Sequence, residues 1–267
     1  MSRNLTSADT EKISKLISAE RLATFQNLTE TDDAAIELHQ ATMILGASIM
    51  SLVGVVEIAL RNSICERMQH DIHPNWLRGD PRPIRLDTRE KNQIKSAENH
   101  AQRAAYSKLD YAQKQALDAA AYPNGKPQGI SHKDEAIARQ RTLIVSDGQV
   151  ISQMTIYFWK SLFAERYEKT LWKRSLKGVF PNKTYDRALI GQHLETLYQT
   201  RNRLAHHEPV YGTRLQAISA AIDFFLENLG SRKPSRESPA AKFILPHYER
   251  FHGDMAVFQT TFERLKK

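Results

Sequence analysis

The sequence contains few cysteine, glycine and proline residues. Cys65 is the single cysteine among 267 residues, and the 11 glycines and 10 prolines cluster in a few segments. One cysteine excludes an intrachain disulfide and a thiolate zinc cluster, and it fits a reducing compartment such as the cytosol. Scarce and clustered glycine and proline favour long helices joined by a few loops.

Patterns typical of β-structure and of common catalytic loops are also missing. No run of alternating apolar and polar residues occurs, no Asn-Gly pair lies between two such runs, and no repeat of fixed period stands out. A phosphate-binding Walker loop, a G-x-S-x-G motif and a dinucleotide-binding fingerprint are absent too. The sequence therefore predicts an all-α protein.

Signals for secretion or for crossing a membrane are weak. Residues 1–15 lack the apolar core of a secretory signal. The most apolar run, residues 41–56, lies between Glu37 and Glu57 and is shorter than the roughly 20 residues that span a bilayer. We expect a buried core helix in this region, no membrane-spanning segment and a cytoplasmic protein.

The charge balance is basic. The chain has 38 lysines and arginines against 30 acidic residues, a formal net charge of +8 and a pI of about 9.5. Such a balance favours polyanionic partners, nucleic acid first and an anionic membrane surface second. A membrane-surface sensor would rest on this charge alone. The basic segments 172–177 and 231–236 are candidates for contact with an RNA backbone, although solvation explains them equally well.

Helical periodicity runs through most of the chain. Ser146 and Gln149 form a capping-box pattern at the start of one expected helix. We expect one helical domain over residues 1–230, with a helical insert at about 88–145, and then a linker and a C-terminal helix over 231–267. The expected helices cover residues 9–28, 31–68, 88–121, 132–145, 147–176, 184–207, 213–229 and 243–265.

An arginine interrupts the apolar stripe of the helix expected over residues 184–207. Arg201 takes a position where the spacing of the stripe calls for a leucine. A charged group there must be paired or must face a polar cleft, because burying it alone is costly. The apolar members of the stripe are Ile190, Leu194, Leu197 and Leu204.

The same helix ends in a cluster of polar and basic residues, within the sequence QTRNRLAHHEPVYG at 199–212. Asn202 and His206 share one face, and Arg203 and His207 share another. Arg201 and His206 lie about 140° apart on an ideal helix. They converge only if the helix end unwinds before the nearby proline, or if each meets a group of a second subunit. Stabilisation of the helix C-terminus by positive charge explains Arg203 and His207 comfortably, but it does not explain Arg201.

Three segments, in this order, resemble the Abi-like (abortive infection) family of HEPN-domain proteins. They are VVEIALRNSI at 55–64, QVISQMTIYFWKSLFAERYEKTLW at 149–172 and LYQTRNRLAHHEPV at 197–210, and the resemblance spans roughly residues 20–230. It implies a HEPN-like helical bundle with peripheral helices, which forms a homodimer with a composite active site. It also implies metal-independent RNA cleavage in phage defence, with an antitoxin or a regulatory RNA as a possible partner.

The resemblance assigns catalysis to Arg201 and His206 and a supporting role to Asn202. Some related toxins carry a modifiable tyrosine two positions after the histidine, but Glu208 stands there in this chain, so that control does not transfer. Arg203 and His207 are further candidates for phosphate binding. Because RNA supplies its own nucleophile, the 2′-hydroxyl, a histidine for proton transfer and an arginine for the phosphate need no metal or cofactor. The alternative is a non-catalytic HEPN module that binds RNA or protein.

Other constellations are weaker. His70 and His73 lie three residues apart, but no third metal ligand accompanies them. The aromatic residues between 157 and 172 have helical spacing, which favours a core role over base stacking. The segment RNSICE at 61–66 repeats the Arg-Asn start of the motif but ends in Glu66, so one chain supplies one complete motif. We therefore expect a two-fold homodimer in which the two 201–207 segments face each other.

Overall fold

The computed structural model describes residues 5–79 and 85–267. In these residues helices account for all the regular structure; no strand is present, and Thr29 and Lys266 form an isolated antiparallel bridge. The prediction of an all-α fold is confirmed. Packing divides the chain into two compact units, the first made of the residues up to Cys65 together with Leu176–Lys267, and the second of Glu66–Ser175.

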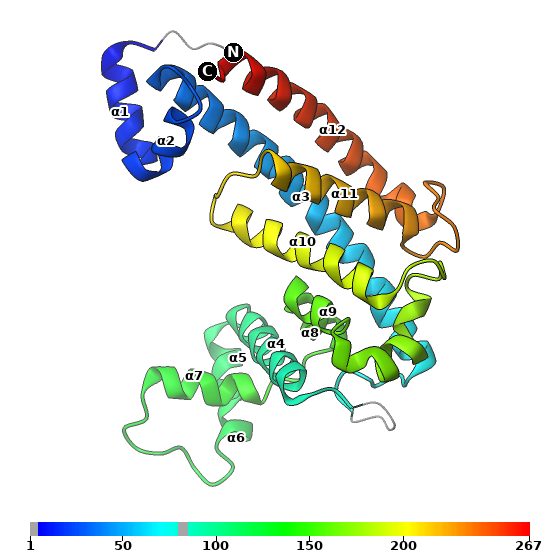
Figure 1. Cartoon of the computed structure of the whole chain (residues 1–267). Helices are drawn as coiled ribbons and strands as arrows, with labels where there is room; N and C mark the ends of the chain where they lie inside the picture. The colour runs from blue at the N-terminus through cyan, green and yellow to red at the C-terminus, as the bar shows by residue number, and fades with distance from the viewer. Residues whose placement is uncertain (1–4, 80–84) are drawn as a thin grey trace. The chain divides into compact units, whose positions relative to one another are not determined.

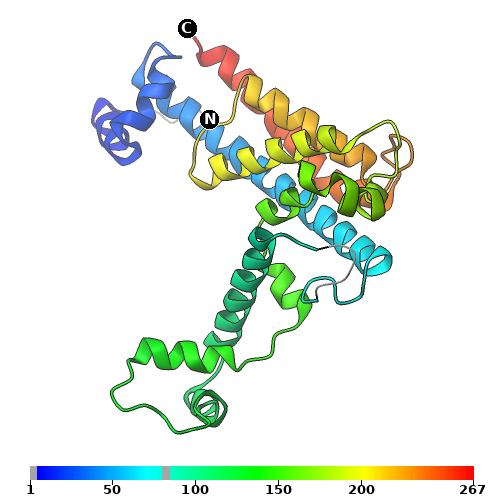
Figure 2. The same ribbon diagram turned by 60° about the horizontal axis from the view of Figure 1, so that its bottom comes forward.

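The first unit is built around the long helix α3. Figures 1 and 2 both show α10, α11 and α12 running alongside α3. An ion pair of 2.6 Å between Arg264 and Glu37, and a hydrogen bond of 3.0 Å between Ser51 and His247, join α12 to α3 in antiparallel orientation. The helices of the first unit are α1 (Ser7–Ile17), α2 (Ala19–Gln26), α3 (Asp32–Asp71, whose last residues belong to the second unit), η3 (Leu176–Gly178), α10 (Arg187–Ala205), α11 (Thr213–Asn228) and α12 (Pro239–Leu265).

The expected helix over 9–28 is two helices. Ser18 has a φ angle of 79°, which a right-handed helix does not allow, and this residue ends α1 and precedes α2. Leu22 and Phe25 of α2 are buried in the first unit. The break gives α2 a direction of its own and brings Arg21 and Phe25 next to His39 of α3.

Helix α3 is the one described helix whose length and composition would let it cross a membrane. In the folded chain, 44% of its most apolar 18-residue window is buried inside the protein. Leu38, Leu45, Leu52 and Leu60 are each at most 1% exposed. Their spacing puts them on one face of the helix, which packs against the rest of the first unit.

The second unit is a smaller cluster in which α4 packs against α7, α8 and α9. The capping box predicted at Ser146 and Gln149 is formed, since each side chain bonds the other residue's backbone N–H. The helices of the second unit are α4 (Thr88–Ser107), α5 (Tyr111–Ala116), α6 (Asp118–Ala121), α7 (His132–Arg141), α8 (Asp147–Ser152), α9 (Ile156–Ser161), η1 (Glu165–Tyr167) and η2 (Glu168–Trp172).

The prediction of a single helix over residues 147–176 is wrong. The backbone turns extended at Thr155 and Ala164, and the segment consists of two short α-helices followed by 3-10 and π turns. Burial explains why the pattern misled. Phe158, Trp159 and Phe163 are all at most 2% exposed, so the segment buries apolar side chains on several sides and has no single stripe to mark a continuous helix.

A buried carboxylate holds the second unit together. Glu90 of α4 is fully buried and accepts hydrogen bonds from the Arg166 guanidinium and, at 2.7 Å, from the Tyr167 hydroxyl. The same hydroxyl accepts a hydrogen bond of 2.9 Å from the backbone N–H of Asp87. Burial raises the pKa of Tyr167 to about 12, so the phenol stays protonated and donates to the carboxylate.

Tyr167→Phe is expected to destabilise the protein by about 1–3 kcal/mol, because it leaves a buried carboxylate oxygen and a backbone N–H without their shared partner. Urea unfolding of the variant and the wild type measures the loss. Tyr111→Phe is the control, since Tyr111 is 75% exposed and its replacement should change stability by no more than about 0.5 kcal/mol. Equal midpoints for Tyr167→Phe and the wild type would contradict the role of this network.

Candidate functional site

Helix α10 carries the motif, and its apolar stripe fixes how the motif is presented. The helix starts at the N-cap Asp186, whose side chain accepts a hydrogen bond of 2.8 Å from the backbone N–H of Leu189. Ile190, Leu194 and Leu197 are fully buried. One turn further on, the buried side chain is Thr200, and Arg201 next to it is half-buried. The arginine therefore lies at the margin of the buried stripe, where its charge can reach a polar surface.

Arg201 lies near two charged residues of α3. Burial raises the pKa of Glu57 above its ordinary value, although the nearby positive charges of Arg201 and Arg61 act to lower it. Glu57 of α3 is therefore close enough to Arg201 of α10 for the two charges to interact. Glu57, Arg61 and Arg201 thus form a half-buried charged cluster between α3 and α10.

The charged groups of this cluster are close to one another but form no ion pair. Glu57 and Arg61 lie four residues apart on α3 but form no ion pair within 4.0 Å, and the Nε of Arg61 donates to the Asn62 side chain at 3.4 Å. Among the described residues, the side chain of Arg201 has no hydrogen bond and no ion pair within 4.0 Å. Its planar fork of N–H donors is available for a ligand, and carboxylate or phosphate oxygens match that geometry.

The wild type is expected to lose stability at high pH as Glu57 deprotonates, and Glu57→Gln is expected to prevent this loss. Because the pKa of Glu57 is raised in the folded chain, the folded state holds this proton more tightly than the unfolded state does. The stabilisation from the protonated Glu57 carboxyl group is fully present below the pKa of the unfolded state, near 4.5, and is lost as the pH rises through the pKa of the folded state. Glutamine mimics the protonated carboxyl group, so the stability of the variant relative to the wild type should increase with pH.

Thermal unfolding of both proteins between about pH 4 and pH 8 tests this expectation. A difference in melting temperature that stays constant over this range would show that Glu57 titrates as it does in water. Asp254→Asn is a control on α12, where the carboxylate forms an ion pair of 3.6 Å with Arg250 outside the site.

The C-terminus of α10 is a complete Schellman motif. The backbone N–H of Glu208 donates to the carbonyl of Arg203 at 2.8 Å, and the N–H of His207 donates to the carbonyl of Leu204 at 3.0 Å. The residue in the left-handed position is His207, with a φ angle of 56°, where most helices use glycine. A strained backbone of this kind is often found at functional sites.

His207→Gly is expected to stabilise the fold by up to about 1 kcal/mol, since glycine adopts a positive φ angle without strain and this gain outweighs the greater freedom of the unfolded glycine. His206→Gly is the matched comparison. With a φ angle of −97°, His206 has no strain to relieve, and its replacement should lower stability by about 0.5–1 kcal/mol. Chemical denaturation of both variants distinguishes the two residues, and equal effects would refute the strain at His207.

The structure presents the other motif residues in different ways. His206 is exposed, and its backbone carbonyl accepts a weak hydrogen bond of 3.5 Å from the Arg21 side chain. Arg203 forms an ion pair of 2.8 Å with Glu208, and Asn202 is half-buried. Arg203 is thereby partly neutralised inside its own chain, which leaves Arg201 as the more available cation.

Arg201 and His206 do not come together within one chain. The helix remains regular to Ala205, and the N–H of His206 still donates to the carbonyl of Asn202 at 3.2 Å. The two side chains therefore keep an angular separation of about 140°. Unwinding before Pro209 begins only after His206 and does not bring them together. A site that uses both residues on one phosphate requires a second contributor.

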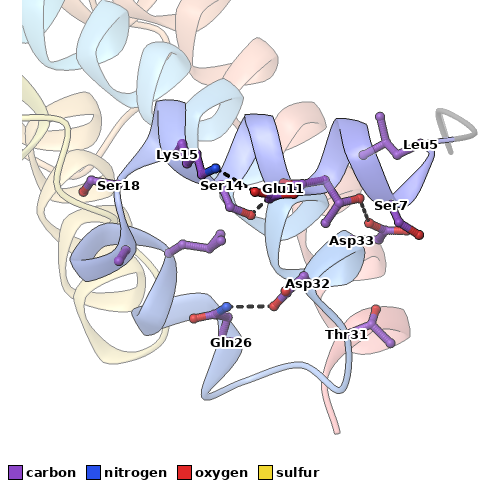
Figure 3. A pocket seen from close by; sticks show the side chains of 13 residues that line it. Leu5, Ser7, Glu11, Ser14, Lys15, Ser18, Gln26, Thr31, Asp32 and Asp33 are labelled. Atoms are coloured by element: carbon purple, nitrogen blue, oxygen red, sulfur yellow. Dashed lines mark hydrogen bonds and ion pairs between the residues drawn. The ribbon is translucent and has the colours of Figure 1, made fainter.

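Cavities of the first unit differ in their relation to this site. A cavity of about 320 Å³ reaches the end of α10 and is lined in part by Leu204, His207 and Glu208. A larger cavity of about 710 Å³ lies between α1, α2 and the start of α3. Figure 3 shows that its charged side chains have polar partners: Lys15 forms an ion pair with Glu11, and Asp32 accepts a hydrogen bond from the Gln26 side chain. The larger cavity contains no motif residue and has no unpaired acid–base group.

Residues considered for other chemistry have local explanations. His70 bonds the neighbouring Asp71 at 2.7 Å, and no group of three His, Cys, Asp or Glu residues in the described part of the chain could hold a metal ion. Burial raises the pKa of the Cys65 thiol to about 11, so it stays protonated and unreactive near neutral pH. Sequence patterns gave no signal for Arg21 and His39, which line the smaller cavity, because both belong to ordinary amphipathic helices.

No protein-family model, curated protein or solved structure matches the chain. The chemistry of the site therefore rests on its own residues.

Proposed function

We propose that this chain is a metal-independent RNA endonuclease of the abortive-infection type, a phage-defence toxin that resembles HEPN ribonucleases. The observation that carries the proposal is the placement of Arg201, which is half-buried, near Glu57 and free of hydrogen-bond partners among the described residues. A guanidinium in this state suits an anion such as the phosphodiester of RNA. The exposed His206 follows on the same helix and supplies an imidazole able to transfer protons near neutral pH.

The reaction uses the nucleophile that RNA itself carries. A histidine takes the proton of the 2′-hydroxyl as this oxygen attacks the adjacent phosphorus. The bond from phosphorus to the 5′-oxygen breaks, and a second acid returns a proton to that oxygen. The products are a 2′,3′-cyclic phosphate and a 5′-hydroxyl. Arg201 stabilises the charge that gathers on the phosphoryl oxygens, and Asn202 orients His206 or binds phosphate.

A two-fold homodimer with a composite site reconciles this chemistry with the separation of Arg201 and His206. In the dimer, Arg201 of one chain meets His206 of the other, so each of the two sites holds one arginine and one histidine. Exposed apolar residues on α3 support an interface along this helix. Ile44 and Ile58 are 64% and 38% exposed, and nothing outside the helix's own backbone lies within 4 Å of where a Cβ of Gly54 would stand.

The charge of the chain agrees with an RNA substrate. A net charge of +8 attracts polyanions, and the motif adds Arg203 to Arg201, with Arg21 at the carbonyl of His206 and Arg61 near Glu57. An unliganded dimer would bring these positive groups together, so RNA or an antitoxin that covers them would stabilise it. A regulatory RNA could act in the same way, in the cytoplasm where the target RNA is found.

Incubation of the purified chain with total RNA in EDTA tests the proposal. We expect cleavage that leaves 2′,3′-cyclic phosphate ends, which T4 polynucleotide kinase can remove by its phosphatase activity. Arg103→Ala and His100→Ala are controls for loss of one exposed arginine or histidine outside the motif, and they should cleave normally. Tight binding of RNA without any cleavage would instead identify the non-catalytic binding module that the sequence also allows.

A further inference from the structure

A small cavity adjoins the proposed cleavage site. It has a volume of about 320 Å³ and lies between α2, α3 and the end of α10, and we name it the α2–α3 pocket. Phe25, Met43 and Met50 supply apolar walls, and Arg21 and His39 supply the basic groups. The volume is at the lower end of the range for small-ligand sites, so the pocket suits one ring system with its substituents and excludes a large cofactor.

His39 is the unusual residue of this pocket. Both of its ring nitrogens are buried, and neither has a hydrogen-bond partner. Phe25 packs edge-on against the imidazole, with ring centroids 5.3 Å apart. Burial, assisted by the charge of Arg21, lowers the pKa of His39, so the ring is neutral and offers one N–H donor and one acceptor. Buried polar groups are nearly always paired, so this ring lacks the partners that a ligand would supply.

The pocket and the motif share a wall. Leu204 and His207 line the pocket on either side of the helix end, and Arg21 donates to the carbonyl of His206. A Cβ added to Gly46 would lie 3.0 Å from the Leu204 side chain, so this glycine lets the end of α10 approach α3 closely. A ligand in the pocket would therefore lie next to the residue that is proposed to transfer protons.

We propose that the α2–α3 pocket binds one unpaired nucleobase of the RNA next to the scissile phosphate, with His39 bonding the edge of the base. Arg21, at the rim beside His206, would contact the neighbouring backbone phosphate. A nucleobase fits these features together, because it is a flat apolar ring with donors and acceptors on its edge and a phosphate attached nearby. This inference rests on the proposed ribonuclease function and names a specificity site for it.

Binding of the four ribonucleoside 5′-monophosphates to the full-length chain tests the pocket without any need for cleavage. Titration followed by ligand-observed NMR should detect at least one of the four. His39→Phe keeps an aromatic ring but removes both nitrogens, and we expect it to weaken binding about tenfold or more. Ala47→Phe should abolish binding, because Ala47 is an exposed helix residue that lines the pocket and a larger side chain would fill it. Gln40→Phe is the matched control, an exposed position of α3 outside the pocket lining, and should leave the Kd unchanged.

A second measurement separates this inference from the proposed function. Mapping of cut positions on single-stranded RNA should show a base preference next to the cut that His39→Phe removes. Cleavage with an unchanged preference in His39→Phe, or nucleotide binding that Ala47→Phe does not reduce, would overturn the pocket and leave the ribonuclease intact. Nucleotide binding that depends on His39 in a chain that never cuts RNA would overturn the ribonuclease and keep the base site.

Two further outcomes are decisive. Equal binding of toluene and of nucleotides, unaffected by His39→Phe, would show an apolar cavity without selectivity and would overturn the inference. Should His39→Phe fail to fold, as judged by its melting temperature, the comparison of Ala47→Phe with Gln40→Phe decides alone, since both substitutions lie at exposed positions.

Discussion

His206→Ala is expected to lower the rate of RNA cleavage about 10²–10⁴-fold, because it removes the group that moves protons to and from the reacting oxygens. Arg201→Ala should lower the rate roughly 10²–10³-fold, because the developing negative charge on the phosphoryl group loses its main cation. Neither substitution should unfold the chain. His206 is exposed at the end of α10, and Arg201 has no hydrogen bond among the described residues that its loss would break.

Single-turnover cleavage of a labelled RNA in EDTA measures both effects. Arg203→Ala is the informative comparison, because Arg203 already forms an ion pair with Glu208 and its replacement should cost far less activity than that of Arg201. Lysine at position 201 keeps the charge but loses the planar fork, so Arg201→Lys should recover only part of the rate. A His206→Ala protein with wild-type activity would remove the residue from the mechanism.

A mixture of Arg201→Ala and His206→Ala chains is expected to recover activity that neither parent has. In a heterodimer with composite sites, one site loses both groups and the other keeps the intact arginine and the intact histidine. Random pairing of equal amounts makes half of the dimers heterodimers, so the mixture should reach about a quarter of the wild-type rate. This outcome follows from the 140° separation of the two residues on an unbroken helix.

Dimer exchange must be shown independently, for example by native mass spectrometry of chains that carry tags of different mass. Heterodimers that form and remain inactive would contradict a site made of one arginine and one histidine from different chains. A strictly monomeric protein with full activity would contradict the composite site altogether.

The fold was predictable where one face of a helix is apolar. Helix α3, expected over 31–68, and helix α10, expected over 184–207, are found at Asp32–Asp71 and Arg187–Ala205 because buried leucines mark their stripes. The helix breaks within residues 147–176 could not be predicted in this way, since buried side chains lie on several sides of the segment and no apolar stripe contrasts with a polar face. The break at Ser18 was also missed, because serine rarely adopts a positive φ angle and gave no warning.

For the site, periodicity identified Arg201 but not its surroundings. A helix pattern shows which face a residue occupies, whereas its neighbours from other helices depend on packing. The proximity of Glu57 to Arg201, the unpaired nitrogens of His39 and the link from Arg21 to His206 are contacts over long sequence separations. The Schellman turn was hidden as well, because a histidine occupies the position where glycine would have signalled it.

The central claim is that the 2′-hydroxyl of RNA is the nucleophile and that no metal takes part. Two RNA oligonucleotides that are identical except for one 2′-deoxy nucleotide on the 5′ side of a mapped cut test it most directly, in EDTA. We predict that cleavage at that position disappears in the substituted strand, while neighbouring positions are still cut and the unsubstituted strand yields a 2′,3′-cyclic phosphate there. Cleavage that persists at the 2′-deoxy position would require another nucleophile and would contradict this account.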